Sequence, residues 1–176
     1  SSAPRTARAS IPSDAPAAVA SGIEFERSRQ WLEAIELYEK SLKKWPDSKE
    51  LQYGLRRSKI HFAVERRYAD SSFDKKLLSK TRTEALATLD EILGQVRANY
   101  VDSVSATSFV AHGTESLYLA LANERFLSRN APQASREQIG QIRAALRDRF
   151  WNKPLASDAA GRAAVSEVCD IAYSTA

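Results

Sequence analysis

The chain has 176 residues, of which 43% are hydrophobic, so it is long and apolar enough to build a folded core. Its 26 basic and 22 acidic side chains give a net charge of +4, which is mildly basic and lacks the charge concentration of a dedicated nucleic-acid-binding protein. The apolar runs are too short for a membrane span, and the single cysteine, Cys169, excludes an intrachain disulfide and a thiolate metal cluster.

The N-terminal segment, residues 1–16, consists mainly of Ser, Ala and Pro with a few charges, and we expect a disordered linker or tail. After it, apolar residues recur at the helical period of 3.6, while glycine and proline are scarce, at six each. We therefore expect residues 17–176 to form a single all-α domain, a helical-hairpin array of about seven helices.

The first three helices are expected over 17–29, 31–44 and 48–68. Trp45-Pro46 ends the second helix, because the residue before a proline is driven out of the helical region. The third helix carries an apolar stripe at helical spacing, formed by Leu51, Leu55, Ser58 and Phe62 and widened by Ile60, Ala63 and Val64.

Residues 71–80 are less regular and predict at most a short turn of helix. The helical region from 83 to 176 then opens with the strongest periodicity in the chain. Apolar side chains there are spaced alternately three and four residues apart, which predicts an amphipathic helix with a core-facing stripe. The stripe consists of Leu86, Leu89, Leu93, Val96 and Tyr100.

Three further helices are expected over 105–123, over 135–150 and from 157 or 158 onward. Ser135 and Gln138 have the spacing of a capping box, which starts the middle one of these helices. Its inward residues are expected to be Ile139, Ile142, Leu146 and Phe150. The last helix carries an apolar stripe of Val165, Val168, Cys169 and Ala172, on which the cysteine is expected to be a buried structural thiol.

A helix, a short turn, a second helix and a proline are typical of the tetratricopeptide repeat, a unit of about 34 residues. With Pro46 at the late proline position, Gly22 and Ala34 occupy small-residue positions, and Phe25 and Tyr38 occupy aromatic positions. We expect the small residues to let two antiparallel helices approach closely. The aromatic rings would fill the space beside the crossing, with Ser41 turned inward. A second repeat would be degenerate, because its signature positions hold Gln52, Leu55 and Arg56.

A second pattern covers residues 84–121, where a helix ending in Asn99-Tyr100-Val101-Asp102 is followed by Val104 and by a helix with Gly113 and Leu117. This segment resembles the N-terminal helical region of carboxyl-terminal-processing (tail-specific) serine peptidases. In that family the region leads into a PDZ domain and a Ser-Lys catalytic domain. The chain has neither a PDZ-like run of strands nor a small-residue motif around a nucleophilic serine, so the resemblance transfers no catalytic residue. It implies a non-catalytic N-terminal region and a periplasmic or cell-envelope location, a compartment that the residues themselves leave open.

The residues that could act in catalysis or metal binding lack companion residues at the required spacing. Two Ser-x-x-Lys spacings occur, beginning at Ser41 and Ser72, but Ser41 occupies a packing position and no companion motif follows. His61 and His112 have no second ligand at metal-binding spacing, and His112 is expected on a packing face beside Gly113. We therefore expect no enzyme activity, cofactor or metal site in this chain.

The densest basic region runs from Arg56 to Arg82, where a solvated face is the ordinary interpretation. A TPR-like groove would bind a protein or peptide partner, or the parent protein's own catalytic domain, through exposed polar side chains. The candidate contact residues are Arg27, Gln30, Arg56, Lys59 and Arg66. The alternative is a small basic helical module that binds nucleic acid or anionic phosphate groups with the same helix. The oligomeric state stays open.

Overall fold

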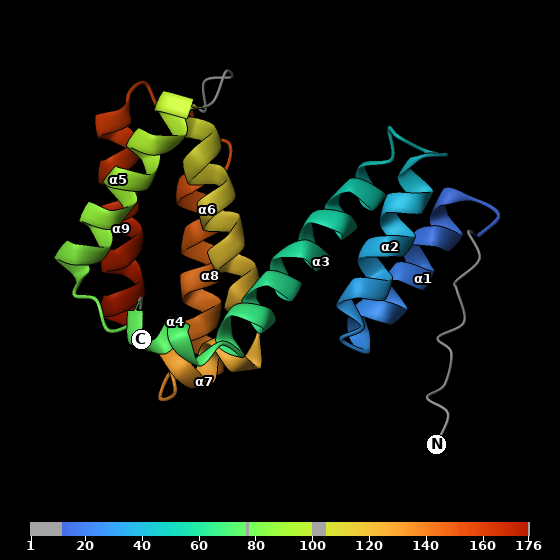
Figure 1. Ribbon diagram of the computed structural model, residues 1–176, viewed down its shortest axis with the longest axis horizontal. Helices are drawn as coiled ribbons and strands as arrows, with labels where there is room; N and C mark the ends of the chain where they lie inside the picture. Colours follow the sequence, from blue (N-terminus) through green and yellow to red (C-terminus); the bar gives the residue numbers. More distant parts are fainter. Residues whose placement is uncertain (1–11, 77, 100–104, 176) are drawn as a thin grey trace. The chain divides into compact units, whose positions relative to one another are not determined.

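The computed structural model describes residues 12–76, 78–99 and 105–175, and every regular element among them is a helix (Figure 1). The prediction of an all-α fold is confirmed. The chain divides into two compact units, a first up to Ala63 and a second from Val64. Whether both belong to the single domain expected over 17–176 stays a prediction. Among the described residues, no helix is long and apolar enough to cross a membrane.

The described residues contain more helices than the seven expected, because two short helices accompany the long ones. They are α1 (Ala15–Arg27), α2 (Trp31–Leu42), α3 (Lys49–Tyr68), α4 (Ser71–Lys76), α5 (Arg82–Asn99), α6 (Ala106–Ala120), α7 (Glu124–Asn130), α8 (Arg136–Phe150) and α9 (Asp158–Thr175). The helix expected over 105–123 ends at Ala120, since the side chain of Asn123 caps a new helix by accepting from the backbone of Arg125 and Phe126.

The first helix begins two residues earlier than the sequence indicated. Asp14 caps it, its Oδ1 accepting from the backbone N–H of Ala17 at 2.8 Å. Pro16 is tolerated in the first turn, where no intrahelical partner is needed for its nitrogen. Ala15 and Pro16 therefore belong to α1 and not to the expected tail, of which residues 1–11 lie outside the described part of the chain.

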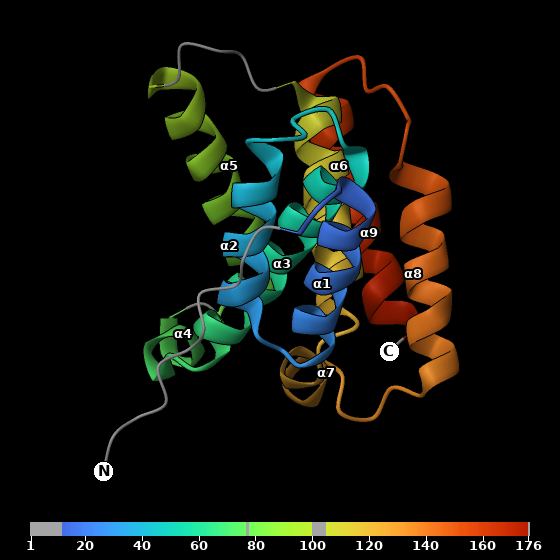
Figure 2. The same cartoon turned by 90° about the vertical axis from the view of Figure 1, so that its right-hand side faces the viewer.

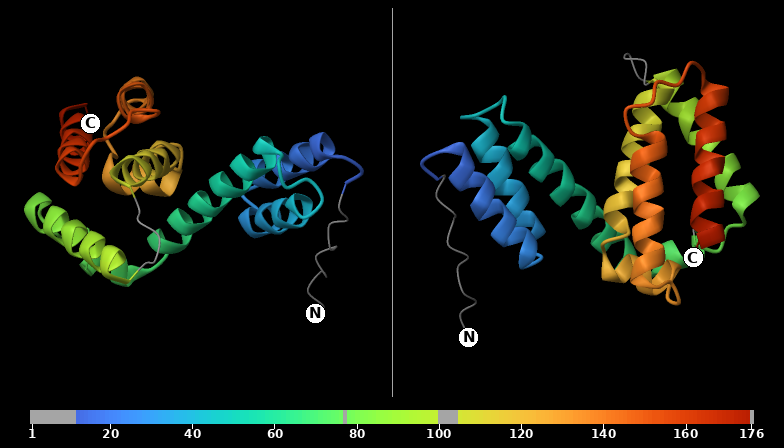
Figure 3. Two further views of the ribbon diagram at one scale, coloured as in Figure 1. Left: turned by 90° about the horizontal axis from the view of Figure 1, so that it is seen from above. Right: turned by 180° about the vertical axis from the view of Figure 1, so that it is seen from behind.

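The core of the first unit centres on Tyr38, which is fully buried together with Ala18, Ala34 and Leu51. The tyrosine ring lies against two glycines, one on each neighbouring helix. A Cβ atom built on Gly22 of α1 would lie 2.3 Å from its Cζ, and one built on Gly54 of α3 would lie 2.5 Å away. The ring therefore needs bare backbone on both sides. Figure 3 shows the hairpin of α1 and α2 beside the N-terminal part of α3.

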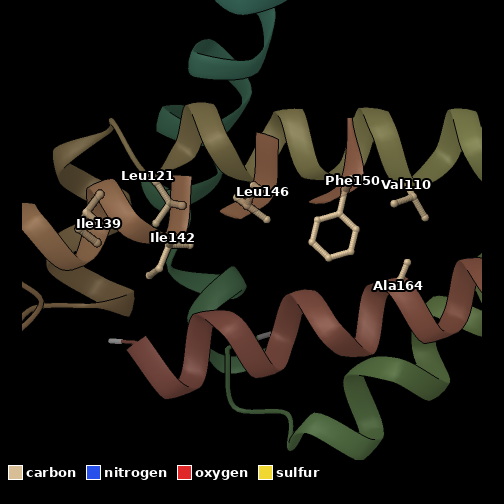
Figure 4. Packing of buried hydrophobic residues seen from close by; sticks show 7 residues of the cluster. All are labelled: Val110, Leu121, Ile139, Ile142, Leu146, Phe150 and Ala164. Atoms are coloured by element: carbon tan, nitrogen blue, oxygen red, sulfur yellow. The ribbon is translucent and has the colours of Figure 1, made fainter. Parts of the chain in front are cut away.

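In the second unit, α6, α8 and α9 pack side by side around a common core (Figure 2). Figure 4 shows the ring of Phe150 between Val110 of α6 and Ala164 of α9. The four inward residues predicted for α8 are all buried, and the predicted capping box of Ser135 and Gln138 is present. Both predictions are confirmed. The buried members of this core are Val110, Leu121, Ile139, Ile142, Leu146, Phe150 and Ala164.

The stripe predicted for α5 faces α6 and α9, but it is covered less completely than a core stripe. Leu86, Leu89, Leu93 and Val96 are each half-buried, and Tyr100 lies outside the described residues. The N-terminal half of α5 borders a cavity of about 1090 Å³. Its C-terminal half lines a much smaller space, of about 30 Å³, together with residues of α6 and α9. In Figure 3, α5 runs beside the three core helices as a separate fourth one.

The short helices of the second unit are held by an aromatic cluster. The ring of Tyr68, in the last turn of α3, lies 5.1 Å from that of Phe73 in α4 and 5.7 Å from that of Phe126 in α7. Asn130 at the end of α7 donates a hydrogen bond to the Tyr68 hydroxyl at 2.8 Å. These contacts position α7 and the loop after it at one end of the α5 cavity, which Phe126 and Asn130 also line.

Candidate partner-binding site

A shallow hollow of about 390 Å³ lies between the end of α2 and the outer face of α3 in the first unit. Leu42, Leu55 and Ile60 form its apolar part, and all three are half-buried. Arg56 and Lys59, both exposed, stand on the same helix face three residues apart. The hollow therefore combines an aliphatic floor with two cations at its edge; its lining is completed by Gln52 and Ala63.

The opposite face of α3 fixes the orientation of this hollow. Leu51, Gly54 and Ser58 are buried there at spacings of three and four residues, as one stripe of a helix requires. Arg56 and Lys59 fall between these positions, so the same periodicity that buries the inner stripe turns both cations outward. The sequence thus determines both the buried face and the exposed face of α3.

A partly buried polar network holds α3 against the hairpin. Arg57 donates to both carboxylate oxygens of Glu26, at 2.7 and 2.9 Å, and Ser58 donates to the same carboxylate at 3.1 Å. Tyr38 adds a fourth hydrogen bond, its hydroxyl donating to Glu26 at 2.9 Å. Burial raises the pKa of Tyr38 well above its ordinary value of 10.0, and the Glu26 carboxylate raises it further. Arg57 is consequently a structural residue, which corrects its assignment to a solvated basic face.

Lys59, one of the two cations at the hollow, has a weak intramolecular partner. Lys59 Nζ lies 2.7 Å from Glu39 Oε1, but the two side chains are 52% and 49% exposed. An ion pair of that exposure contributes at most about 1 kcal/mol, because water screens it. The Lys59 contact can therefore be exchanged for a contact with an incoming carboxylate at small cost in free energy. The Arg56 guanidinium lies 5.5 Å from the centre of the Tyr53 ring.

Of the five candidate contact residues, the structure brings together Arg56 and Lys59. Arg27 pairs with Glu24 at 2.7 Å on the exposed end of α1, and the exposed Gln30 precedes α2; neither lines the hollow. Arg66 is exposed and belongs to the second unit. The site is therefore narrower than the sequence suggested.

The residues assigned to repeat packing occupy different environments. Gly22, Ala34 and Tyr38 are buried, as is Ser41. Phe25 is half-buried against the same core, and Pro46 is exposed beyond the end of α2, which stops at Leu42.

Sequence reasoning missed three contributors to this region. Gly54 is not one of the signature positions of the second repeat, although an isolated glycine inside a helical pattern is itself a sign of close packing. Leu42 lies near the end of the second helix, and no pattern in the sequence indicated that it lines a hollow. His61 was treated as isolated, yet it is buried and its ring stacks on Trp31 at 4.6 Å between centroids with a 12° interplanar angle.

Two further residue assignments need correction. His112 and Gly113 are exposed, and a Cβ on Gly113 would meet nothing within 4 Å, so the expected packing face of α6 does not include them. The inward stripe of that helix runs instead through Val110 and Thr114. Cys169 is half-buried and lines the α5 cavity, because α5 leaves this part of α9 uncovered.

Within the described residues, no group of three or more His, Cys, Asp or Glu side chains is arranged to hold a metal ion. Comparison of the chain with protein-family models, with curated proteins and with solved structures gave no match.

Proposed function

We propose that this chain is a non-catalytic helical interaction region, which binds a short partner segment carrying acidic and aliphatic side chains in the hollow between α2 and α3. One observation carries the proposal: Arg56 and Lys59 flank an apolar hollow formed by Leu42, Leu55 and Ile60. Aliphatic side chains would fill the floor, and carboxylates would pair with the two cations.

The size of the hollow favours a peptide segment. About 390 Å³ accommodates a few side chains, which suits an extended or helical segment that inserts anchors at regular spacing. The Glu26 network supports recognition, since it fixes α3 and so reduces the loss of conformational freedom on binding.

We further propose that the chain belongs to the N-terminal region of a protein similar to the carboxyl-terminal-processing peptidases. The partner segment would then come from another protein or from the parent's own catalytic domain. Burial of Gly22, Ala34 and Tyr38 at the helix crossing supports the TPR-like part of this idea. The coding sequence beyond Ala176 tests the rest: a PDZ domain followed by a Ser-Lys catalytic domain would support it, and an unrelated domain would contradict it.

The Arg57–Glu26 pair disfavours the nucleic-acid alternative. Arg57 is held by Glu26 at 2.7 Å, and the two side chains are only 23% and 11% exposed. Arg57 is therefore withdrawn from the basic face that would have to contact several phosphates.

The test is selection of peptides from a phage-displayed random library against the full chain, followed by fluorescence polarisation with the selected peptides. We expect acidic and aliphatic residues to be enriched. The double variant Arg56→Glu/Lys59→Glu should weaken binding at least about tenfold, because two attractive contacts become repulsive. Ile60→Asn should also weaken peptide binding, because it places a polar side chain in the apolar floor of the hollow.

The matched control is Arg136→Glu/Lys153→Glu, which changes the net charge equally at two exposed residues of the second unit. We expect it to bind peptide like the wild type. Equal peptide affinity of the Arg56/Lys59 variant and the wild type would refute the site. Retention of duplex DNA that falls steeply between low and physiological salt would instead favour the nucleic-acid alternative.

A further inference from the structure

The second unit contains a far larger hollow than the first, the α5 cavity of about 1090 Å³. Its wall is mainly apolar and is built by α5, α6, α7, α8, α9 and the loop between α7 and α8. Representative wall residues from four of these helices are Leu86, Leu89, Leu117, Ile142 and Val165. Protein interiors are normally close-packed, so an apolar space of this size is suited to a ligand of matching surface.

Helix α5 is joined to α9 at its N-terminal end, beside the cavity. At the N-terminal end, Arg82 Nη2 lies 2.7 Å from Asp170 Oδ1 and donates to Ser166 Oγ at 2.8 Å. Farther along α5, Val96 lines a second, much smaller space of about 30 Å³ together with Phe109 of α6 and Gly161 of α9.

The polar groups of the lining define the charge of a suitable ligand. Its two charged residues, Arg82 and Asp170, pair at its exposed edge, where their side chains are 52% and 63% exposed, and the other lining residues are uncharged. An ionised group held against that uncharged wall would lose its hydration without gaining a counter-ion, which is unfavourable. Asn130 uses its amide N–H groups on Tyr68 and on the Phe126 carbonyl, which leaves its Oδ1 to accept from a hydroxyl group.

We infer that the second unit binds an uncharged, elongated hydrophobic molecule of the lipid class that carries one hydroxyl group. The volume of about 1090 Å³ lies just above the usual range of small-molecule pockets, about 300–1,000 Å³. The hydrocarbon part would fill the space between α5 and the core, and the hydroxyl group would donate to Asn130. This site is separate from the peptide hollow and does not depend on it.

The first experiment titrates the full chain with the uncharged dye Nile red. Ala85 lines the cavity, whereas Ala87, also exposed on α5, does not. We expect Ala85→Trp, which fills the space, to weaken dye binding at least about tenfold and Ala87→Trp to leave it unchanged. Equal binding by both variants would refute the site, provided that circular dichroism shows both to be folded.

The second experiment uses the wild type, so that it does not depend on a substitution. Cys169 lines the cavity and is the single cysteine of the chain, so an uncharged maleimide labels this one place. We expect 1-dodecanol to displace Nile red and slow the labelling several-fold, and dodecanoate, with the same chain length and a charge, to do so much less. Unchanged labelling with dodecanol would overturn the proposal. Labelling that slows with protein concentration alone would also overturn it, in favour of a second copy covering the cavity.

Discussion

The ring of Tyr38 lies between Gly22 and Gly54, with no room for a methyl group at either glycine. Alanine is intrinsically favoured over glycine in a helix by about 1 kcal/mol. Here we expect the opposite result, because the new Cβ would displace a fully buried ring, and overpacking of this kind costs about 1–3 kcal/mol. Gly22→Ala and Gly54→Ala should therefore each lower the free energy of unfolding, measured by urea denaturation and circular dichroism.

The chain provides its own control for this prediction. Gly113 and Gly140 are also helical, and a Cβ on either would meet nothing within 4 Å. Gly113→Ala and Gly140→Ala should thus raise stability by up to about 1 kcal/mol. If all four substitutions shifted stability in the same direction, the close approach at Tyr38 would not be the cause.

The hydroxyl group of Tyr38 gives the first unit a dependence on alkaline pH. Its pKa is raised by burial and by Glu26, so the folded chain holds this proton to higher pH than the unfolded chain, which releases it near pH 10. Below about pH 10 both states are protonated, and the stabilisation is fully present. Above it the unfolded state binds fewer protons, so the free energy of unfolding falls as pH rises, by at most about 1.4 kcal/mol per pH unit for one proton.

Tyr38→Phe removes both the hydrogen bond to Glu26 and this titration. We expect the variant to be less stable than the wild type at neutral pH, and the difference to shrink as pH rises beyond about 10. Urea denaturation at several pH values measures it. Tyr173, whose side chain is 92% exposed, supplies the control, since Tyr173→Phe should follow the wild type throughout. A difference that stayed constant or widened with pH would contradict the assignment.

At the scale of the helices, α8 and α5 have similar apolar periodicity but different energetic roles. Leu146 of α8 is fully buried in the core, so Leu146→Ala should destabilise the chain by about 2–5 kcal/mol. Leu86 of α5 is half-buried beside the cavity, and Leu86→Ala should cost less than half as much, because less contact is lost. Denaturation of both variants without added ligand compares the two helices. Equal losses would mean that α5 is packed as tightly as α8.

The contrast between α8 and α5 shows which features of the fold are predictable from the sequence alone. Periodicity and a capping box identify α8 with its buried face, since both are local signals. The spacing of three and four residues is equally clear in α5, but periodicity reports an apolar face and not what covers it. Arg56 and Arg57 make the same point at the site: adjacent in sequence, one is exposed and the other binds Glu26, a residue 31 positions away. Such long-range partners are set by tertiary packing and leave no local pattern.

At the scale of the whole molecule, each of the two units has its own hydrophobic core. Chains with separate cores often unfold in more than one step, so we expect two transitions. The tryptophans report on them separately, since Trp31 and Trp45 belong to the first unit and Trp151 to the second. The measurement is tryptophan fluorescence during urea denaturation of two versions of the chain, one with Trp151→Phe and one with Trp31→Phe and Trp45→Phe.

Leu146→Ala, placed in each of these two versions, assigns the transitions. The substitution should lower the urea midpoint reported by Trp151 and leave the midpoint reported by Trp31 and Trp45 unchanged, because Leu146 belongs to the core of the second unit. Gly54→Ala should have the converse effect, since Gly54 contacts Tyr38 in the first core. If either substitution moved both midpoints together, the units would unfold as one cooperative domain, as the sequence indicated for residues 17–176. Two independent midpoints would instead mean that a peptide bound to the first unit and a lipid bound to the second each stabilise their own transition.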